Sequence, residues 1–238
     1  MNNKKQIFLP GLNKQFDFLK KNLSVSPKFV LVIGSGSETA ATLISNHFSC
    51  DIELIVQDYE SLMNSKIILG NNSNIKVSLM NFEVTDFDSE SFDLIYAQAS
   101  ISLLNRNKII KELKRILSPG GYICLGEIVS LEKNVPSFVK DIFEAAGLLP
   151  LFIDELEKYY TERMLVMVSL QNFSDTLYEY YTQYTSQLKS SKYDLTDSEK
   201  SYYKKILNKI SHESNSYLKL GGDKFIGFVS LLLQKGQN

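Results

Sequence analysis

A short glycine-containing turn is the first place in the sequence suited to holding a ligand. The segment FVLVIGSGS begins with an apolar run, Phe29 to Ile33, and ends in Gly34, Ser35 and Gly36. An uninterrupted apolar run of this length is typical of a buried parallel strand. Glycine lets the backbone approach a ligand closely, and the first amides of a following helix can meet its polar end. A strand–helix turn that binds nothing has the same pattern.

A carboxylate near the next apolar run extends this candidate site. Asp58 follows the segment IELIVQ and lies about 20 residues beyond Gly36, a separation at which a carboxylate can accept hydrogen bonds from ribose hydroxyls. An acid in this position can instead cap the helix that follows. The spacing fits a nicotinamide dinucleotide as well as S-adenosylmethionine, so the residues alone leave the ligand open.

Alternating strand and helix patterns supply the elements that would position these residues. Leu12, Phe16 and Leu19 have helical spacing, and SPGG at 118–121 fits a type II turn in which Gly supplies the positive φ. We expect further helices over 38–47, after Asp58, beyond Asn105 and between Pro136 and Gly147, and strands over 29–33, 52–56, 75–80, 92–97 and 122–129. This order predicts an α/β fold with a Rossmann-like, doubly wound and mostly parallel sheet.

The last ninety residues, roughly, break this alternation. LPLFIDEL at 149–156 predicts the sixth strand, and KFIGFVSLLLQK at 224–235 predicts an antiparallel seventh. Between them, apolar residues from Val166 to Leu188 recur at steps of three and four, which predicts a helix. Thr196 to Glu199 form a capping-box pattern that predicts another. The sheet is therefore expected to have seven strands and a helical insertion before the last one.

Four segments carry a resemblance to a known family. FVLVIGSGSETAATL, IVQDYESLM, SFDLIYAQASISLL and IIKELKRILSPGGYICLGE resemble the motifs of class I S-adenosylmethionine-dependent methyltransferases. The nearest group is methyltransferase type 11, the ubiquinone/menaquinone-biosynthesis-like group, and the resemblance covers residues 29–129. It implies an enzyme that binds S-adenosylmethionine as cofactor and transfers its methyl group to a small-molecule acceptor.

The resemblance also implies where the cofactor binds. Gly34, Ser35 and Gly36 would pass beneath its methionine portion, Asp58 would hold the ribose, and Tyr59 would pack beside the adenine.

Two further pairs of residues complete the implied cofactor site. Asn81 occupies a position where the family usually has an acid facing the adenine amino group, and its amide oxygen can still accept that hydrogen bond. Phe82 lies next to it. Ala97 and Gln98 would lie against the methionine moiety at the end of the fourth strand.

Two residues depart from the family's usual motif. Val32 stands in place of an acid that helps orient the methionine ammonium, and Glu38 stands in place of a third glycine. A carboxylate at 38 could meet the ammonium itself or favour the helix N-terminus. A non-catalytic methyltransferase-like binding or scaffold protein therefore stays open as an alternative. A nicotinamide-dependent oxidoreductase is less favoured, because the turn does not complete G-x-G-x-x-G.

The acceptor site is less clearly marked. Most of the 13 tyrosines lie in the expected insertion, and Tyr combines apolar area with a polar tip, as a pocket for a flat acceptor requires. Such rings also pack helix against helix. We predict a Rossmann-like domain over 1–156 and 223–238 and a helical lid over 157–222, whose Tyr160, Tyr181 and Tyr217 would bind the acceptor.

Glu127 is the one candidate for a catalytic group. It lies near the end of the strand after SPGG, where it could orient an acceptor or remove a proton, or it could be a supporting carboxylate. Methyl transfer does not require a base, because aligning the acceptor with the electrophilic sulfonium supplies much of the rate.

Composition excludes several other classes of function. The net charge of −1, from 26 basic and 27 acidic residues, gives no concentrated positive field for nucleic acid. Two cysteines and two histidines favour neither a disulfide framework nor a metal site. No segment approaches the roughly 20 apolar residues of a membrane span, and the first residues lack a signal-peptide core. We expect a cytoplasmic enzyme, and nothing in the sequence indicates its oligomeric state.

Overall fold

The computed structural model describes residues 9–70, 72–190 and 213–236. Its strands form one sheet in the order β3-β2-β1-β4-β5-β8-β7, and β6 pairs with β5 off this path. The strands are β1 (Phe29–Ile33), β2 (Asp51–Val56), β3 (Ile75–Leu79), β4 (Phe92–Gln98), β5 (Leu117–Ser130), β6 (Leu151–Phe152), β7 (Leu165–Asn172) and β8 (Ile226–Lys235). All pairs are parallel except those of β8 with β5 and β7. The predicted α/β fold is confirmed, including the antiparallel last strand.

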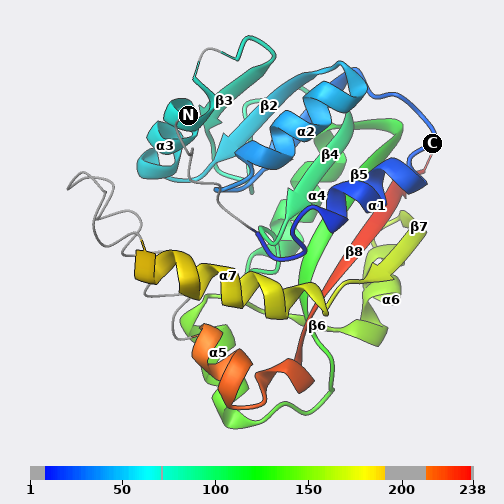
Figure 1. Ribbon diagram of the computed structural model, residues 1–238. Coiled ribbons are helices and arrows are strands. Elements are labelled where there is room, and N and C mark those ends of the chain that lie inside the picture. Colours follow the sequence, from blue (N-terminus) through cyan, green and yellow to red (C-terminus); the bar gives the residue numbers. More distant parts are fainter. Residues whose placement is uncertain (1–8, 71, 191–212, 237–238) are drawn as a thin grey trace.

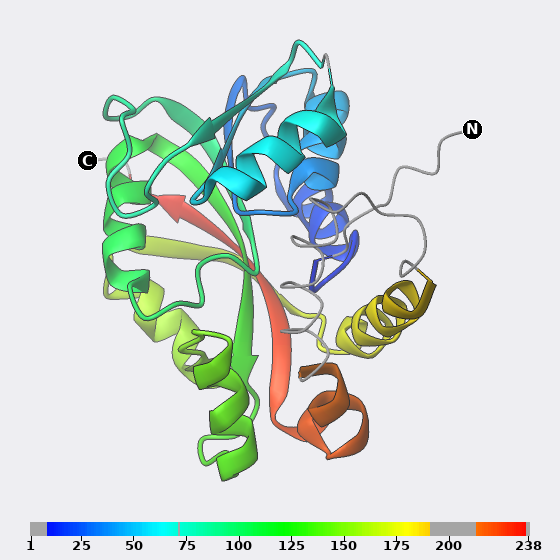
Figure 2. The ribbon, with the colours of Figure 1, turned by 90° about the vertical axis from the view of Figure 1, so that its left-hand side faces the viewer.

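Helices cover both faces of this sheet (Figure 2). They are α1 (Lys14–Asn22), α2 (Glu38–Phe48), α3 (Tyr59–Leu69), α4 (Arg106–Ile116), α5 (Ser137–Ala145), α6 (Leu156–Thr161) and α7 (Thr176–Ser190), with short 3₁₀ helices at Ile153–Glu155 and Gly222–Lys224. One core cluster joins α1, α2 and α7 to the sheet, and a second joins α4 and α6 to the opposite face. Because both faces are covered, the residues from Val30 to Ile33 are fully buried.

The sixth long strand is not the one predicted. LPLFIDEL forms only the two-residue β6 and then turns into a 3₁₀ helix and α6. Apart from the short β6, the strand that follows β5 in the chain is β7. It lies inside the segment predicted to be a lid helix. Val166 and Leu170 are four residues apart and so mimic a helical stripe. In the edge strand, they and Val168 lie at every second position and are 58%, 42% and 45% exposed. Pairing with β8 favours the strand, because it satisfies the backbone groups of β7 that face β8.

The direction of β7 places the following helices at the carboxyl edge of the sheet. Both β5 and β7 are antiparallel to β8, so β7 ends at the same edge as β1, β4 and β5. Figure 1 shows α7 crossing beyond that edge. Residues 213–219 are also helical, and they pack with α7 through Tyr181 and Tyr217. The predicted capping box at 196–199 lies outside the described residues.

Among the helices of the described segments, none is long and apolar enough to cross a membrane.

Candidate functional site

The glycine turn lies where the ends of three strands meet. Ile33, the last residue of β1, pairs with Ile55 of β2 on one side and with Ala97 of β4 on the other. Gly34 and Gly36 follow with φ values of +114° and +83°, a region that side-chain-bearing residues rarely adopt. The turn therefore needs glycine for its own conformation.

The interior of this turn is closely bordered by two serines that the resemblance did not assign to the cofactor site. A Cβ added to Gly34 would lie 2.7 Å from Cβ of Ser100 and 3.7 Å from Oγ of Ser37. Ser100 Oγ donates to the Ile33 carbonyl at 3.0 Å. The Ser37 hydroxyl is fully buried and has no hydrogen-bond partner among the described residues. Its position before the first residue of α2 is the only sequence signal that marks it.

Two side chains of the turn bond to α3. Ser35 Oγ donates to Ser61 Oγ at 2.7 Å, and Ser65 Oγ donates to Glu38 Oε1 at 2.5 Å. Glu38 is only 3% exposed. Burial raises the pKa of Glu38, whereas the hydrogen bonds from Ser65 and from the backbone of Glu38 and Gly36 lower it. The carboxylate that replaces the family's third glycine is thus held against α3.

Asp58 caps α3. Helix capping was the alternative to ribose binding that the sequence left open. Its Oδ1 accepts from the Ser61 amide at 2.8 Å and its Oδ2 accepts from Ser61 Oγ at 2.7 Å. The side chain is exposed, and a carboxylate has about four lone-pair sites. Asp58 therefore keeps capacity for ribose hydroxyls while it caps the helix.

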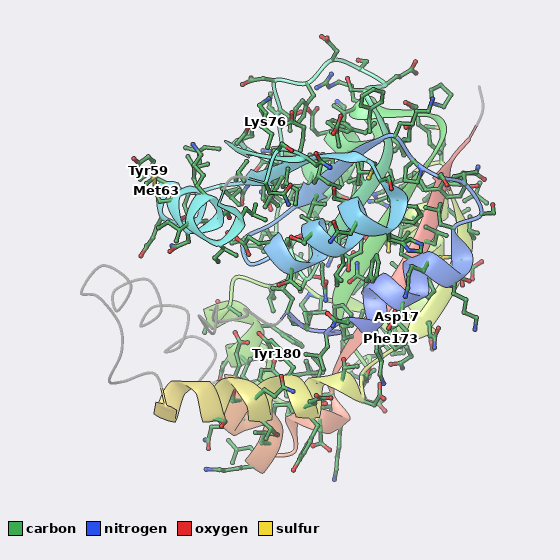
Figure 3. The ribbon with its side chains drawn as sticks, turned by 45° about the horizontal axis from the view of Figure 1, so that its top comes forward. Asp17, Tyr59, Met63, Lys76, Phe173 and Tyr180 are labelled. Carbon is green, nitrogen blue, oxygen red and sulfur yellow. The ribbon has the colours of Figure 1, made fainter. Side chains whose placement is uncertain are left out.

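Of the residues expected at the adenine, Tyr59 lies on the surface and Phe82 lies in the core. Tyr59 is 68% exposed, and Figure 3 shows it beside Met63 on the outer side of α3. The Oδ1 atom of Asn81 accepts from the Glu83 amide at 2.9 Å, so the oxygen expected to face the adenine amino group serves a local turn. Phe82 is buried in the core cluster around α4.

The two residues expected at the methionine moiety are both buried. Ala97 is fully buried, and its carbonyl accepts from Gln15 Nε2 at 3.2 Å. Gln98 is 4% exposed and directs its amide toward the chain segment before α1. The structure therefore places Gln98 at the expected edge of the sheet but gives its amide protein partners.

Glu127, the candidate catalytic group, is fully buried and surrounded by donors. Its carboxylate accepts from the Tyr160 hydroxyl, from Ser102 Oγ at 2.5 Å and from Arg106 Nη2 at 3.3 Å. The same Arg106 nitrogen donates to the Leu149 carbonyl at 2.8 Å. Glu127 of β5 thus accepts hydrogen bonds from α4, α6 and the loop after β4. This is the role of a supporting carboxylate, the alternative to a catalytic group.

Tyr160 lies apart from the other two tyrosines expected at the acceptor. It belongs to the core cluster of α4 and α6, on the face opposite α1 and α2. Burial raises its pKa well above 10. Full burial beside Glu127 argues against contact with an acceptor, and no periodicity in the sequence could have shown that α6 turns this side chain inward.

Tyr181 and Tyr217 do lie together, on the α1 and α2 face. Their ring centroids are 4.8 Å apart, and they are 3% and 4% exposed. Burial raises the pKa of Tyr217 to about 12. Phe173 and Tyr180 belong to the same core cluster, and Figure 3 shows Tyr180 on α7. In this arrangement the two rings pack helix against helix.

Comparison with known proteins identifies a domain and a fold that this chain resembles. Residues 31–125 match the family described as a methyltransferase domain. No curated protein sequence matches the chain significantly. Phosphoethanolamine N-methyltransferase 2 from Haemonchus contortus, in complex with phosphomonomethylethanolamine and S-adenosylhomocysteine, is similar with a TM-score of 0.77 at 13% identity, over 97% of this chain and 55% of that one.

Two other solved structures have the same fold. Geranyl diphosphate C-methyltransferase from Streptomyces coelicolor, in complex with Mg²⁺, geranyl diphosphate and S-adenosyl-L-homocysteine, gives a TM-score of 0.69 at 13% identity over 94% of this chain and 77% of that one. The [4+2]-cyclase SpnF gives 0.76 at 15% identity over 95% and 81%. These likenesses show the fold. The match of residues 31–125 to the methyltransferase domain supports an enzyme that transfers methyl groups and uses S-adenosylmethionine.

Proposed function

We propose that this enzyme methylates a small-molecule acceptor, with the cofactor bound across the carboxyl ends of β1, β2 and β4. The observation that carries this proposal is the turn at Gly34 to Gly36, whose left-handed glycines lie beside the buried and unpartnered Ser37 hydroxyl. Two of the similar structures contain small acceptors, phosphomonomethylethanolamine and geranyl diphosphate. We also propose that the nearest subgroup is the ubiquinone/menaquinone-biosynthesis-like one.

The residues present fit S-adenosylmethionine at this turn. Ser100 leaves no room for a side chain at position 34, so the turn carries only backbone there. Ser37 offers a hydroxyl to a polar ligand. Asp58 would accept from the ribose hydroxyls and Tyr59 would cover the adenine. When bound, the cofactor supplies a methyl group on a positively charged sulfur. The chain's own part is then to orient the acceptor and exclude water, since alignment supplies much of the rate.

Calorimetry with three ligands tests this function directly. Titration with S-adenosylmethionine and S-adenosylhomocysteine should give saturable heats, and titration with NAD should give none. The cyclase among the similar structures makes a second measurement necessary. Binding without methyl transfer to any acceptor in a panel of small molecules would favour the non-catalytic alternative, and binding of NAD alone would favour an oxidoreductase.

We expect Asp58→Ala to weaken S-adenosylhomocysteine binding by about 1.5–3 kcal/mol, the range for hydrogen bonds to a charged group. Because Asp58 also caps α3, Asp58→Ser is the matched control. Serine caps a helix as well as aspartate does but carries no charge. Calorimetry should show both variants binding weakly, with only the alanine variant losing thermal stability. Unchanged affinity in both would mean that Asp58 is only a cap.

We further propose that the helices at the carboxyl edge form the acceptor-binding lid. Since β7 belongs to the sheet, the described part of the lid is limited to α7 and residues 213–222. Amides of 176–190 and 213–219 should exchange more slowly with solvent when S-adenosylhomocysteine and an acceptor bind, because closure shields them. Amides of Val30 to Ile33 should be protected throughout. Equal exchange of the helices with and without ligands would make them fixed scaffold.

A further inference from the structure

The side-chain amide of Gln98 joins the end of β4 to the segment that precedes α1. Its Nε2 donates to the Pro10 carbonyl at 2.8 Å and to the Leu12 carbonyl at 2.9 Å. The Tyr96 hydroxyl donates to Gln98 Oε1 at 2.9 Å. Carbonyl oxygens only accept hydrogen bonds, so these partners determine which end of the amide faces the segment. We call residues 9–13 the N-terminal strap.

The strap is shaped to lie closely on the sheet. Gly11 has a φ of +85°, and an added Cβ would clash with the Phe228 ring. Leu12 has a φ of +47°, which non-glycine residues seldom adopt unless their surroundings hold them there. The Leu12 amide donates to the Leu9 carbonyl at 2.9 Å and the Lys14 amide donates to the Gly11 carbonyl at 3.0 Å. The strap is therefore a tight turn, and Gln98 is its anchor in the sheet.

A small cavity separates the strap from the glycine turn. Its volume is about 20 Å³, which is close to the space that one water molecule needs. Leu9, Leu12 and Asn13 of the strap form one side, and Gly36 and the first turns of α2 form the other. Tyr96 and Gln98 of β4 complete the lining. The strap thus makes a wall opposite the turn that the proposed function assigns to the cofactor.

We propose that Gln98 is a positioning residue, which seats the N-terminal strap as the wall that closes the cofactor site beside Gly36. This inference rests on the proposed function for what the site binds, but the seating of the strap is independent of it. Gln98 also lines the cavity, but its amide nitrogen already donates to two carbonyls of the strap, so we infer that it acts on a ligand by positioning the strap. The resemblance to the methyltransferase motifs, by contrast, implied that Gln98 lies directly against the cofactor.

Gln98→Glu tests the anchor with almost no change in shape. A carboxylate cannot donate to the Pro10 and Leu12 carbonyls and should repel them, whereas a protonated carboxyl group can donate to one of them. The strap should be released at high pH and reseated in part as the pH falls through the pKa of the new group. The titratable groups nearby have pKa values raised by burial, to about 12 for Cys124 and well above 10 for Tyr96. Asp17 of α1 is the nearby acid.

Hydrogen exchange of the strap is measured first, without ligand. At pH 8 the Leu12 and Lys14 amides of Gln98→Glu should exchange at least about tenfold faster than in the wild type, once corrected for the intrinsic pH effect, and at pH 5 this difference should shrink. Calorimetry should then show S-adenosylhomocysteine binding weakened by roughly tenfold at pH 8 and partly restored at pH 5. Gln171→Glu, on the exposed part of β7, is the matched control and should show neither effect.

A second variant keeps the proposal testable if Gln98→Glu folds poorly. Tyr96→Phe removes only the hydroxyl that orients the Gln98 amide and should loosen the strap less. Strap exchange equal to that of the wild type in both variants would overturn the proposal. So would a tenfold loss of affinity with an unchanged strap, since Gln98 would then contact the ligand itself. If the wild type binds no S-adenosyl compound, the proposed function fails while the strap measurement still decides the anchor.

Discussion

Gly36→Val is expected to abolish S-adenosylhomocysteine binding while leaving the fold largely intact. Gly36 has a φ of +83°, so a β-branched residue distorts the turn as well as filling space that the ligand needs. The strands on either side stay buried and paired, because the change falls in the connection between β1 and α2. Calorimetry measures the affinity, and circular dichroism with thermal unfolding measures the fold.

Gly70→Val is the matched control for this experiment. Gly70, at the end of α3, also has a positive φ of +58°, and nothing lies within 4 Å of an added Cβ. A valine at position 70, like one at position 36, has an unfavourable backbone conformation, but it lies away from the proposed cofactor site. We expect Gly70→Val to lose some stability and to bind normally. Normal binding by Gly36→Val would show that the turn is only structural and that the cofactor site has been misplaced.

Glu127→Ala is expected to lower the free energy of unfolding by about 3–5 kcal/mol, because it leaves the buried charge of Arg106 without its partner. The side chains of Glu127 and Arg106 are 0% and 4% exposed. The hydroxyls of Tyr160 and Ser102 lose their acceptor at the same time. Urea unfolding followed by circular dichroism gives the change in free energy.

Two further variants separate the buried charge from other causes. Glu127→Ala combined with Arg106→Met removes both charges and should recover part of the lost stability. Asp175→Ala breaks the exposed ion pair with Lys14 and should cost less than about 1 kcal/mol. A Glu127→Ala variant that unfolds like the wild type but transfers no methyl group would instead assign Glu127 a direct part in the reaction.

Local patterns in the sequence were sufficient for most of the sheet and for the glycine turn. The continuous apolar run of β1 predicts a buried parallel strand, and Gly34 and Gly36 predict a strand–helix turn. Both properties depend on neighbouring residues, so they can be derived without a partner. The helix after Asp58 and the closing strand β8 were predictable for the same reason. The match of residues 31–125 to the methyltransferase domain follows from these local features.

Only the tertiary structure decided which groups these side chains face. The apolar spacing of 165–172 fits a helix and a strand, and pairing with β8 made it β7. Glu127 received three donors from separate elements, and Gln98 bonds to Pro10 across 88 positions of the chain. Hydrogen-bond partners at such separations leave no periodicity in the sequence, because they depend on how the sheet brings distant segments together. For this reason the sequence can suggest where a site lies, whereas the fold determines which of the suggested side chains remain available to a ligand.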